Sequence, residues 1–374
     1  MRKTAIVVTM GFALTMALAG SASAADETVK IGIGLPLTGQ IGFLGQQFLK
    51  GAKVATEVVN ESGGIGGRKL ELVVRDHKGI PAEAVSVAKR LIYEEHVKVL
   101  DVDLPASATI AVEGVTKEAK IPQLGGYAFS TMTLQQNDPW YFQTSITSDT
   151  LATAAAKMMH DAKGNETVAM LAPNDDYGRG EVAAIKSALA KAGSPKVIYD
   201  DYYERTQTDY SAALLKMKSL NPSSLFLDVR FPDSVTVLKQ LAEFGIKKPL
   251  FSTINFYNPK LVDQAGQYME GTFIALNWAP ELNDPASNAF KEVYQAKLKE
   301  LPDANAELGW TSVNVIAAAL KSAGADANAE AIRAALKKTD WMSPGGPIKF
   351  DEHNDARVPA HILEFKDGKY HVIN

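Results

Sequence analysis

The 374-residue sequence contains no cysteine. Disulfides, thiolate nucleophiles and iron–sulfur clusters are therefore excluded, because each of them needs cysteine sulfur. Positive charge is not in excess either, since 39 lysines and arginines stand against 43 aspartates and glutamates, for a formal charge of -4. A chain with this balance has no basic surplus to neutralise phosphates, so we expect no nucleic acid among its partners.

Signatures of catalysis and of cofactor or metal binding are also missing. Gly32-Ile33-Gly34 resembles the start of a dinucleotide-binding fingerprint, but the next glycine, Gly39, follows at the wrong spacing. The sequence has no Walker A loop, no G-x-S-x-G elbow and no H-E-x-x-H motif. The polar run 351–355 lacks the spaced ligands of a calcium loop and is more typical of a solvated turn. We therefore expect no enzyme, no cofactor and no metal site.

The first 24 residues have the pattern of a secretory signal peptide. Arg2 and Lys3 precede an uncharged, mostly apolar run, and Ala22-Ser23-Ala24 offers small residues where a signal peptidase cleaves. A membrane anchor is the alternative, and it is disfavoured because the apolar run is shorter than most spanning helices. We expect export, with cleavage after Ala24.

Beyond this leader, strand-like apolar runs alternate with helical stripes. Such alternation predicts an α/β fold in which helices cover both faces of parallel sheets, and the chain length favours two domains. The predicted strands are 29–35, 70–76, 97–102, 167–172, 196–201, 224–229 and 249–253, and the predicted helices between them are 45–61, 82–95, 180–192, 210–220 and 234–244.

The loops that follow these strands are the predicted place for a ligand, because ligands of open parallel sheets bind at the carboxyl ends of the strands. Aromatic side chains recur in those loops in both halves of the chain, as in a cleft between two domains. The residues concerned are Phe43, Tyr127, Phe129, Tyr177, Tyr202, Phe231, Phe256 and Tyr257, together with Arg230 and Asn255.

The run 31–39, Ile-Gly-Ile-Gly-Leu-Pro-Leu-Thr-Gly, resembles the opening of the periplasmic leucine/isoleucine/valine-type binding proteins of ABC transporters. Segments 60–71, 121–123, 176–180 and 209–211 continue the resemblance over nearly the whole mature chain. The resemblance implies the periplasmic binding protein type I fold, with two Rossmann-like lobes joined by three crossovers. It also implies a periplasmic protein that encloses a small molecule by hinge closure and delivers it to an inner-membrane permease. We expect it to be a monomer.

The expected division of the chain follows from this architecture. Residues 1–24 form the signal peptide, 25–143 plus 277–346 the N-terminal lobe, and 144–276 plus 347–374 the C-terminal lobe. The three crossovers are predicted near Thr144–Ile146, Ile274–Leu276 and Pro347–Asp351.

The resemblance assigns ligand contacts to two loops of the N-terminal lobe. In amino-acid-binding members these loops present hydroxyls and a backbone amide to the ligand's carboxylate. This chain departs from the pattern, because Ala106 stands at the main serine position and Phe129 at a threonine position, unless a one-residue gap places Ser130 there. The candidates in these loops are Ser107, Thr109, Tyr127, Ala128 and Phe129.

In the C-terminal lobe the resemblance matches Tyr177 to a pocket tyrosine. Asn255 falls near the acid that pairs with the ligand's ammonium, and Arg230 stands where an aromatic or small residue is common. A buried ammonium without a carboxylate partner is costly, whereas arginine can bind a carboxylate through two hydrogen bonds. Asn255 in place of the acid and Arg230 in place of an aromatic or small residue together predict a site that favours a ligand with a carboxylate and no ammonium group. The other interpretation of Arg230 is a salt bridge at the cleft rim, with Asp228 or Asp233.

The predicted function is that of a substrate-binding component of an ABC importer of the branched-chain amino acid family, which captures a small amino acid or a related carboxylate. One alternative is a binding protein for an aromatic or other non-amino-acid carboxylate or amide. Another is a ligand-sensing receptor module of the same fold. An exported hydrolase would need a nucleophile–base pair, which the sequence does not display.

Overall fold

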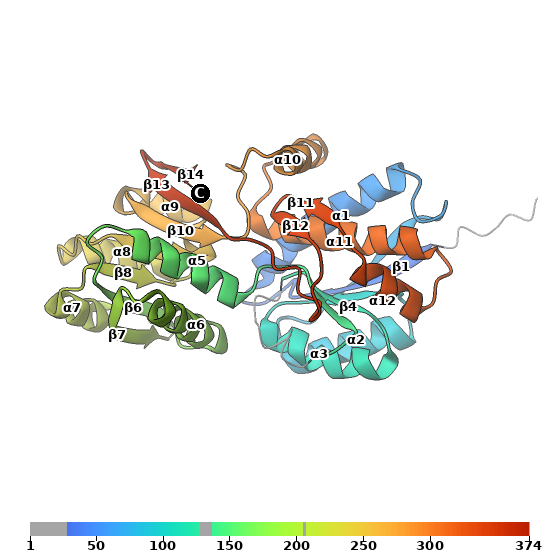
Figure 1. Ribbon diagram of the computed structural model, residues 1–374, viewed down its shortest axis with the longest axis horizontal. Coiled ribbons are helices and arrows are strands. Elements are labelled where there is room, and N and C mark those ends of the chain that lie inside the picture. The colour runs from blue at the N-terminus through green and yellow to red at the C-terminus, as the bar shows by residue number, and fades with distance from the viewer. Residues whose placement is uncertain (1–27, 128–136, 205–206, 374) are drawn as a thin grey trace, which may run out of the picture.

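The computed structural model describes residues 28–127, 137–204 and 207–373. Two α/β lobes lie side by side along the long axis of the molecule, and the chain passes between them several times (Figure 1). No helix among the described residues is both long and apolar enough to span a membrane.

The first lobe contains a five-stranded parallel sheet in the order β2-β1-β3-β4-β5. Its strands are β1 (Val29–Leu35), β2 (Leu70–Asp76), β3 (Leu100–Val102), β4 (Gln123–Gly125) and β5 (Tyr141–Gln143). The core on one face includes residues of α2 (Pro81–Tyr93) and α3 (Ala106–Ala119). The core on the other face includes residues of α1 (Gly42–Glu61) and α11 (Ala304–Ala323), followed by α12 (Ala329–Lys337). Strand β1 is buried on both faces, as its continuous apolar run predicts.

The second lobe contains a seven-stranded mixed sheet in the order β14-β13-β10-β9-β8-β6-β7. Five strands are parallel, and the last two of the chain add antiparallel at one edge. The strands are β6 (Thr167–Pro173), β7 (Lys196–Tyr203), β8 (Ser224–Leu227), β9 (Leu250–Thr253), β10 (Thr272–Leu276), β13 (His361–Lys366) and β14 (Lys369–Val372). The helices are α5 (Ser148–Asp161), α6 (Asp176–Ala192), α7 (Ser211–Leu220), α8 (Asp233–Glu243) and α9 (Pro259–Ala265), with the short 3-10 turns η1 (Ile254–Phe256) and η2 (Gly266–Tyr268).

Helices α1 and α11 meet at their backbones. A Cβ on Gly51 would lie 1.8 Å from the carbonyl oxygen of Ala306, and one on Gly309 would lie 2.0 Å from that of Phe48. Such distances exclude any side chain at either position without separation of the helices. Helix α10 (Pro285–Leu298) packs beside them, where Phe290 and Trp278 contact edge to face. This close pairing fixes α11, a late segment of the chain, to the first lobe.

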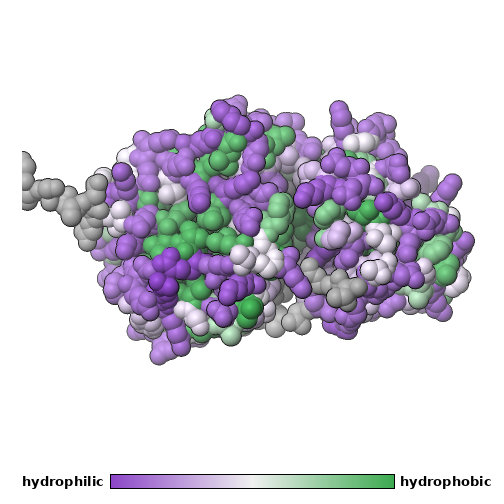
Figure 2. Space-filling model, turned by 180° about the vertical axis from the view of Figure 1, so that it is seen from behind, coloured by the Kyte–Doolittle hydropathy of each residue, from purple (hydrophilic) through white to green (hydrophobic). Residues whose placement is uncertain are grey.

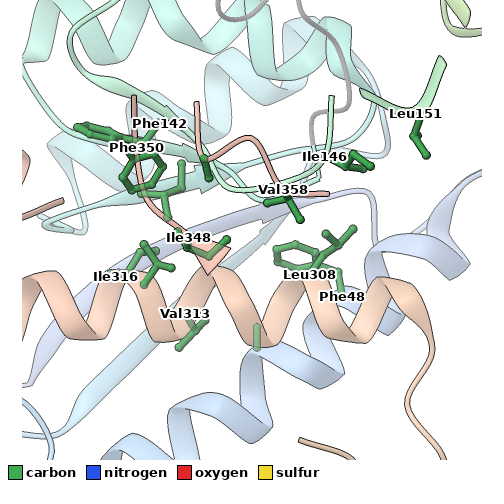
Figure 3. Close-up of a cluster of buried hydrophobic side chains, with 14 of the residues drawn as sticks. Phe48, Phe142, Ile146, Leu151, Leu308, Val313, Ile316, Ile348, Phe350 and Val358 are labelled. Carbon is green, nitrogen blue, oxygen red and sulfur yellow. The ribbon is translucent and has the colours of Figure 1, made fainter. Parts of the chain in front are cut away.

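The third passage between the lobes lies further along the chain than Pro347–Asp351. After the hairpin of β11 (Trp341–Ser343) and β12 (Gly346–Ile348), the chain stays against the first sheet. Phe350 packs edge to face on Phe142 of β5 at 5.1 Å, and Asp355 forms a parallel bridge with Gln143. In Figure 3, Ile348, Phe350 and Val358 lie between the sheet and α11. The chain therefore leaves the first lobe between Val358 and the start of β13.

Candidate ligand-binding site

Segments that follow strands of both sheets approach each other between the lobes. The Lys260 ammonium on α9 lies 5.8 Å from the centre of the Phe43 ring on α1. Arg230, which follows β8, is close enough to Tyr127, which follows β4, for its charge to affect the tyrosine's ionisation. Figure 2 shows a hollow between the two lobes. The candidate cleft lies here, at the carboxyl ends of strands from both sheets, where the sequence predicted it.

Arg230 is fixed in the second-lobe wall by two neighbours. Its Nη1 donates to Asp175 Oδ2 at 2.6 Å, and its guanidinium lies 4.7 Å from the centre of the Tyr177 ring. Asp175 is itself held, because its Oδ1 accepts from the backbone N–H of Gly178 at 2.9 Å and caps α6. The predicted rim salt bridge to Asp228 or Asp233 is thus replaced by one to Asp175. Arg230 keeps 20% of its side chain exposed, so the bound guanidinium still borders solvent.

Two carboxyl groups are buried behind Arg230. Asp228 directly follows β8 and is 0% exposed, and Glu181 on α6 is 3% exposed. Asn255 in η1 donates from Nδ2 to Asp228 Oδ1. Burial raises the pKa of Asp228, and the charge of Glu181 raises it further. Burial raises the pKa of Glu181 as well, so both carboxyls hold a proton more readily than exposed carboxyls do.

These acids change the charge of the site. The sequence argument for an anion rested on Asn255 as a neutral substitute for an acid, and the structure adds a buried carboxyl, that of Asp228, which accepts a hydrogen bond from Asn255. Burial alone would lower the pKa of Arg230, but the carboxylates of Asp228 and Asp175 raise it. The positive charge of Arg230 is therefore offset in place by the Asp175 carboxylate, with which it forms an ion pair.

The first-lobe wall is anchored on a second pair of buried acids, Asp101 and Asp103. Asp103 accepts from the backbone N–H of Tyr127 and from the hydroxyl of Thr109, both at 2.9 Å, and Asp101 accepts from Ser312 of α11. Burial raises the pKa of both carboxyls. The pair therefore fixes the backbone at the end of β4, where the loop of the cleft begins.

The sequence profile of the periplasmic binding protein family matches residues 28–369. The chain belongs to this family. Among its relatives, the Leu/Ile/Val-binding protein homolog 1 of Brucella suis biovar 1 is 26% identical over 377 residues, covering 100% of both chains. The resemblance and the α/β fold inferred from the sequence are thereby confirmed at the level of the family.

Solved structures of periplasmic binding proteins share the fold of this chain. A branched-chain amino acid transporter substrate-binding protein from Streptococcus pneumoniae, in complex with isoleucine, has a TM-score of 0.82 at 24% identity and covers 93% of this chain and 99% of its own. A solute-binding protein of an ABC transporter from R. palustris, in complex with benzoate, also has a TM-score of 0.82, at 23% identity over 93% and 96%. The same fold thus holds both a zwitterion and a simple anion.

The predicted site residues of this periplasmic binding protein fall into four groups. Tyr127, Tyr177, Arg230 and Asn255 lie together around the two acid pairs, as described above. Phe43 is 54% exposed on α1 and Ser107 is exposed in the first turn of α3. Ala128 and Phe129 lie outside the described residues.

Two candidates point away from the cleft. Thr109 is 0% exposed and its hydroxyl donates to Asp103, so it acts inside the lobe. Phe256 is 0% exposed in the apolar core of the second lobe. It follows Asn255 directly, but successive side chains of a 3-10 turn are rotated by about 120°, so the two residues point in different directions, which the loop assignment could not resolve.

The sequence analysis missed Asp175 and Glu181 as site residues and named Asp228 only as a salt-bridge partner of Arg230. An acid at Asp228, inside an otherwise apolar predicted strand, was the available signal, because a charged residue in a buried strand needs a partner. Within the part of the chain that the structure describes, no group of three histidine, aspartate or glutamate side chains is arranged to hold a metal ion.

Proposed function

We propose that this protein is the substrate-binding component of an ABC importer of the branched-chain amino acid family, and that it captures a small amino acid or a related carboxylate between its lobes. The proposal includes export to the periplasm with cleavage after Ala24, action as a monomer, and docking of the closed form on an inner-membrane permease. Family membership and the relatives' names support the transport role.

The observation that carries the ligand class is the state of Arg230. One of its five guanidinium N–H groups donates to Asp175, and none of the others has a hydrogen-bond partner among the described residues. A guanidinium that is held rigid on a tyrosine face and still borders solvent is suited to bind a carboxylate. Since Tyr127 of the other lobe lies within reach of the same charge, a bound carboxylate would sit between the lobes.

Closure about the crossovers is the proposed mechanism. Ligand held on one wall adds contacts to the other wall only when the lobes approach, so binding energy favours the closed form. Asn277, the first residue after β10, is anchored to Glu307 of α11 at 3.1 Å, which ties one crossover to the first lobe. The remaining freedom then lies in the backbone of the short connections.

A second candidate is an aromatic carboxylate without an ammonium group. Tyr177 and the exposed Phe43 offer aromatic faces near the cleft. The neighbour in complex with benzoate shows that the fold accommodates such a solute.

Thermal-shift measurements on the mature chain, residues 25–374, test the proposal. Leucine, isoleucine, valine, alanine, threonine and phenylalanine are compared with benzoate, 3-phenylpropanoate and 4-methylpentanoate. A ligand at 100 times its Kd stabilises the folded state by about 2.7 kcal/mol, which gives a clear rise in Tm. Rises with the amino acids support the first candidate, and rises only with benzoate or 3-phenylpropanoate support the second. No rise with any of these compounds would refute the proposal.

A further inference from the structure

A second cavity lies away from the cleft, beside the connections between the lobes, and we call it the hinge cavity. Its volume is about 680 Å³, which is within the range of small-molecule sites. Its walls come from three places: segment 282–286, where the connection from β10 runs into α10, the turn of the β11–β12 hairpin, and His361 at the start of β13. No described residue of the cleft walls lines it, so the hinge cavity is separate from the solute site.

The walls of the hinge cavity belong to different lobes. Ser287 of α10 donates to the carbonyl oxygen of Pro344 in the hairpin turn at 3.0 Å, which ties two walls together, and α10 packs on the first lobe. The third wall belongs to the second lobe, because His361 is paired in the sheet with Leu276 at the end of β10. His361 Nε2 donates to the carbonyl oxygen of Gly345 at 3.1 Å and joins this wall to the hairpin turn (Figure 1). Rotation of the lobes moves the third wall relative to the other two and therefore changes the width of the cavity.

The lining of the hinge cavity is chiefly apolar. Its apolar side chains are those of Leu282, Pro285, Ala286, Met342 and Pro344. Met342 is 58% exposed, so a molecule in the cavity would cover apolar surface that the fold leaves in water. Covering such surface is favourable through the hydrophobic effect, and exposed apolar surface often marks a binding site.

Two polar side chains of the lining already have partners within the protein. Asp284 caps α10 and accepts from the backbone N–H groups of Ala286 and Ser287, both at 3.0 Å. Ser343 donates to the carbonyl oxygen of Gly346 at 2.7 Å and accepts from the N–H of the same residue at 3.1 Å. An anion would meet the carboxylate of Asp284 with no lysine or arginine in the lining, and a cation would lose its hydration beside an apolar surface. The lining therefore fits an uncharged molecule.

We propose that the hinge cavity is a second ligand site, which binds a small, uncharged, apolar molecule and thereby changes the balance between the open and closed forms. Because its walls move with different lobes, a molecule that fits one width favours the arrangement of the lobes that has this width. The site acts on closure without contact with the cleft, and it does not depend on which solute the cleft binds.

The uncharged fluorescent dye prodan is the probe, because its emission shifts when it enters an apolar site. It is titrated into the mature chain, residues 25–374. Met342→Glu places a charge in the lining at an exposed position, and we expect it to weaken prodan binding at least about tenfold, because the charge loses hydration beside an apolar ligand. Leu215→Glu, at an exposed apolar position of α7, is the matched control and should change the affinity by less than about twofold.

Ala286→Trp is a second variant, which fills part of the hinge cavity and should also weaken prodan binding. Circular dichroism checks that each variant is folded. Prodan binding that both folded variants leave unchanged lies elsewhere and overturns the inference, as does the absence of binding to the unmodified chain. Sedimentation velocity gives the oligomeric state. A dimer that Met342→Glu separates would mean that a second copy covers this face, which also overturns the inference.

The absence of cysteine allows two introduced labels to report how the lobes are arranged. Ser86→Cys on α2 and Ser187→Cys on α6 are exposed positions in different lobes, and nitroxide labels there give inter-lobe distances by double electron–electron resonance. We expect prodan to change the distribution of these distances in the labelled chain that carries Leu215→Glu, and not in the one that carries Met342→Glu. Binding without any such change overturns the coupling to closure. These measurements use no cleft solute, so their failure leaves the proposed function standing.

Discussion

Glu307 provides a quantitative test of the hinge region. It lies on α11, is 2% exposed, and accepts from Asn277 Nδ2 at 3.1 Å and from Thr311 Oγ1 at 2.6 Å. The backbone N–H of Gly345, near the third passage of the chain, also donates to it. Burial raises the pKa of this carboxyl from 4.5 to about 7. Glu307 therefore titrates near neutral pH, where it contacts one connection between the lobes, at Asn277, and the turn of the β11–β12 hairpin, at Gly345.

The direction of the effect on stability follows from this raised pKa. Between pH 4.5 and about 7 the folded protein holds a proton on Glu307 that the unfolded chain has released, so the free energy of unfolding falls as pH rises. One pKa unit corresponds to about 1.4 kcal/mol, so the full contribution is about 3 kcal/mol below pH 4.5. Between pH 5 and pH 8 the folded state should lose about 2.5 kcal/mol from this group alone.

Glu307→Gln removes the titration and keeps the shape of the side chain. Urea unfolding at pH 5 and at pH 8 gives the free energy of unfolding for both proteins, and contributions from all other groups cancel in the difference. We expect the variant to lose about 2.5 kcal/mol less than the wild type between the two pH values. Glu243→Gln, the same change at an exposed position of α8, is the matched control. Equal losses in the wild type and Glu307→Gln, within about 0.5 kcal/mol, would refute the reasoning.

Three further predictions concern ligand binding, packing and closure. Arg230→Met should weaken carboxylate binding by about 2–5 kcal/mol in titration calorimetry, because both Asp175 and the ligand's carboxylate lose the guanidinium as their partner. A loss below about 1 kcal/mol would mean that Arg230 forms a salt bridge at the cleft rim and does not bind the ligand. Gly51→Ala should lower stability by more than about 2 kcal/mol in thermal unfolding, because its Cβ would lie 1.8 Å from a carbonyl oxygen of α11. Gly180→Ala on α6 is the control and should not lower stability in this way, because its Cβ would meet open space. Small-angle scattering should show a smaller radius of gyration once a bound solute is present, and an unchanged radius at saturation would argue for a rigid module.

Several features of the fold could be predicted from local sequence. The predicted strands 29–35 and 70–76 are the observed β1 and β2. Strand β1 is a mostly apolar run, as a buried parallel strand requires, whereas β2 lies at the edge of the sheet and carries charged residues among its apolar ones. Helix α6 begins at Asp176 instead of 180, since Asp175 caps it and its first turn contains no apolar stripe to reveal it. The late segment 346–358 was not predictable, because its few apolar residues gain a partner only when α11 and β5 stand on either side (Figure 3).

Part of the candidate site could also be predicted from local sequence. Tyr127, Tyr177, Arg230 and Asn255 were accessible from sequence, because they follow strands whose carboxyl ends must meet at one edge of each sheet.

The sequence by itself thus determined the α/β alternation, the family resemblance, and the loops that border the cleft, since periodicity and strand order are local properties of the chain. Only the tertiary structure decided the charge of that cleft. Asp175, Glu181, Asp228 and Arg230 are spread over 56 positions, and Asn255 follows after another strand. Electrostatic energy in a low-dielectric interior depends on the distances between charges and not on their order in the sequence. The pairing of these residues therefore depends on their burial and on the distances across β8, β9 and α6.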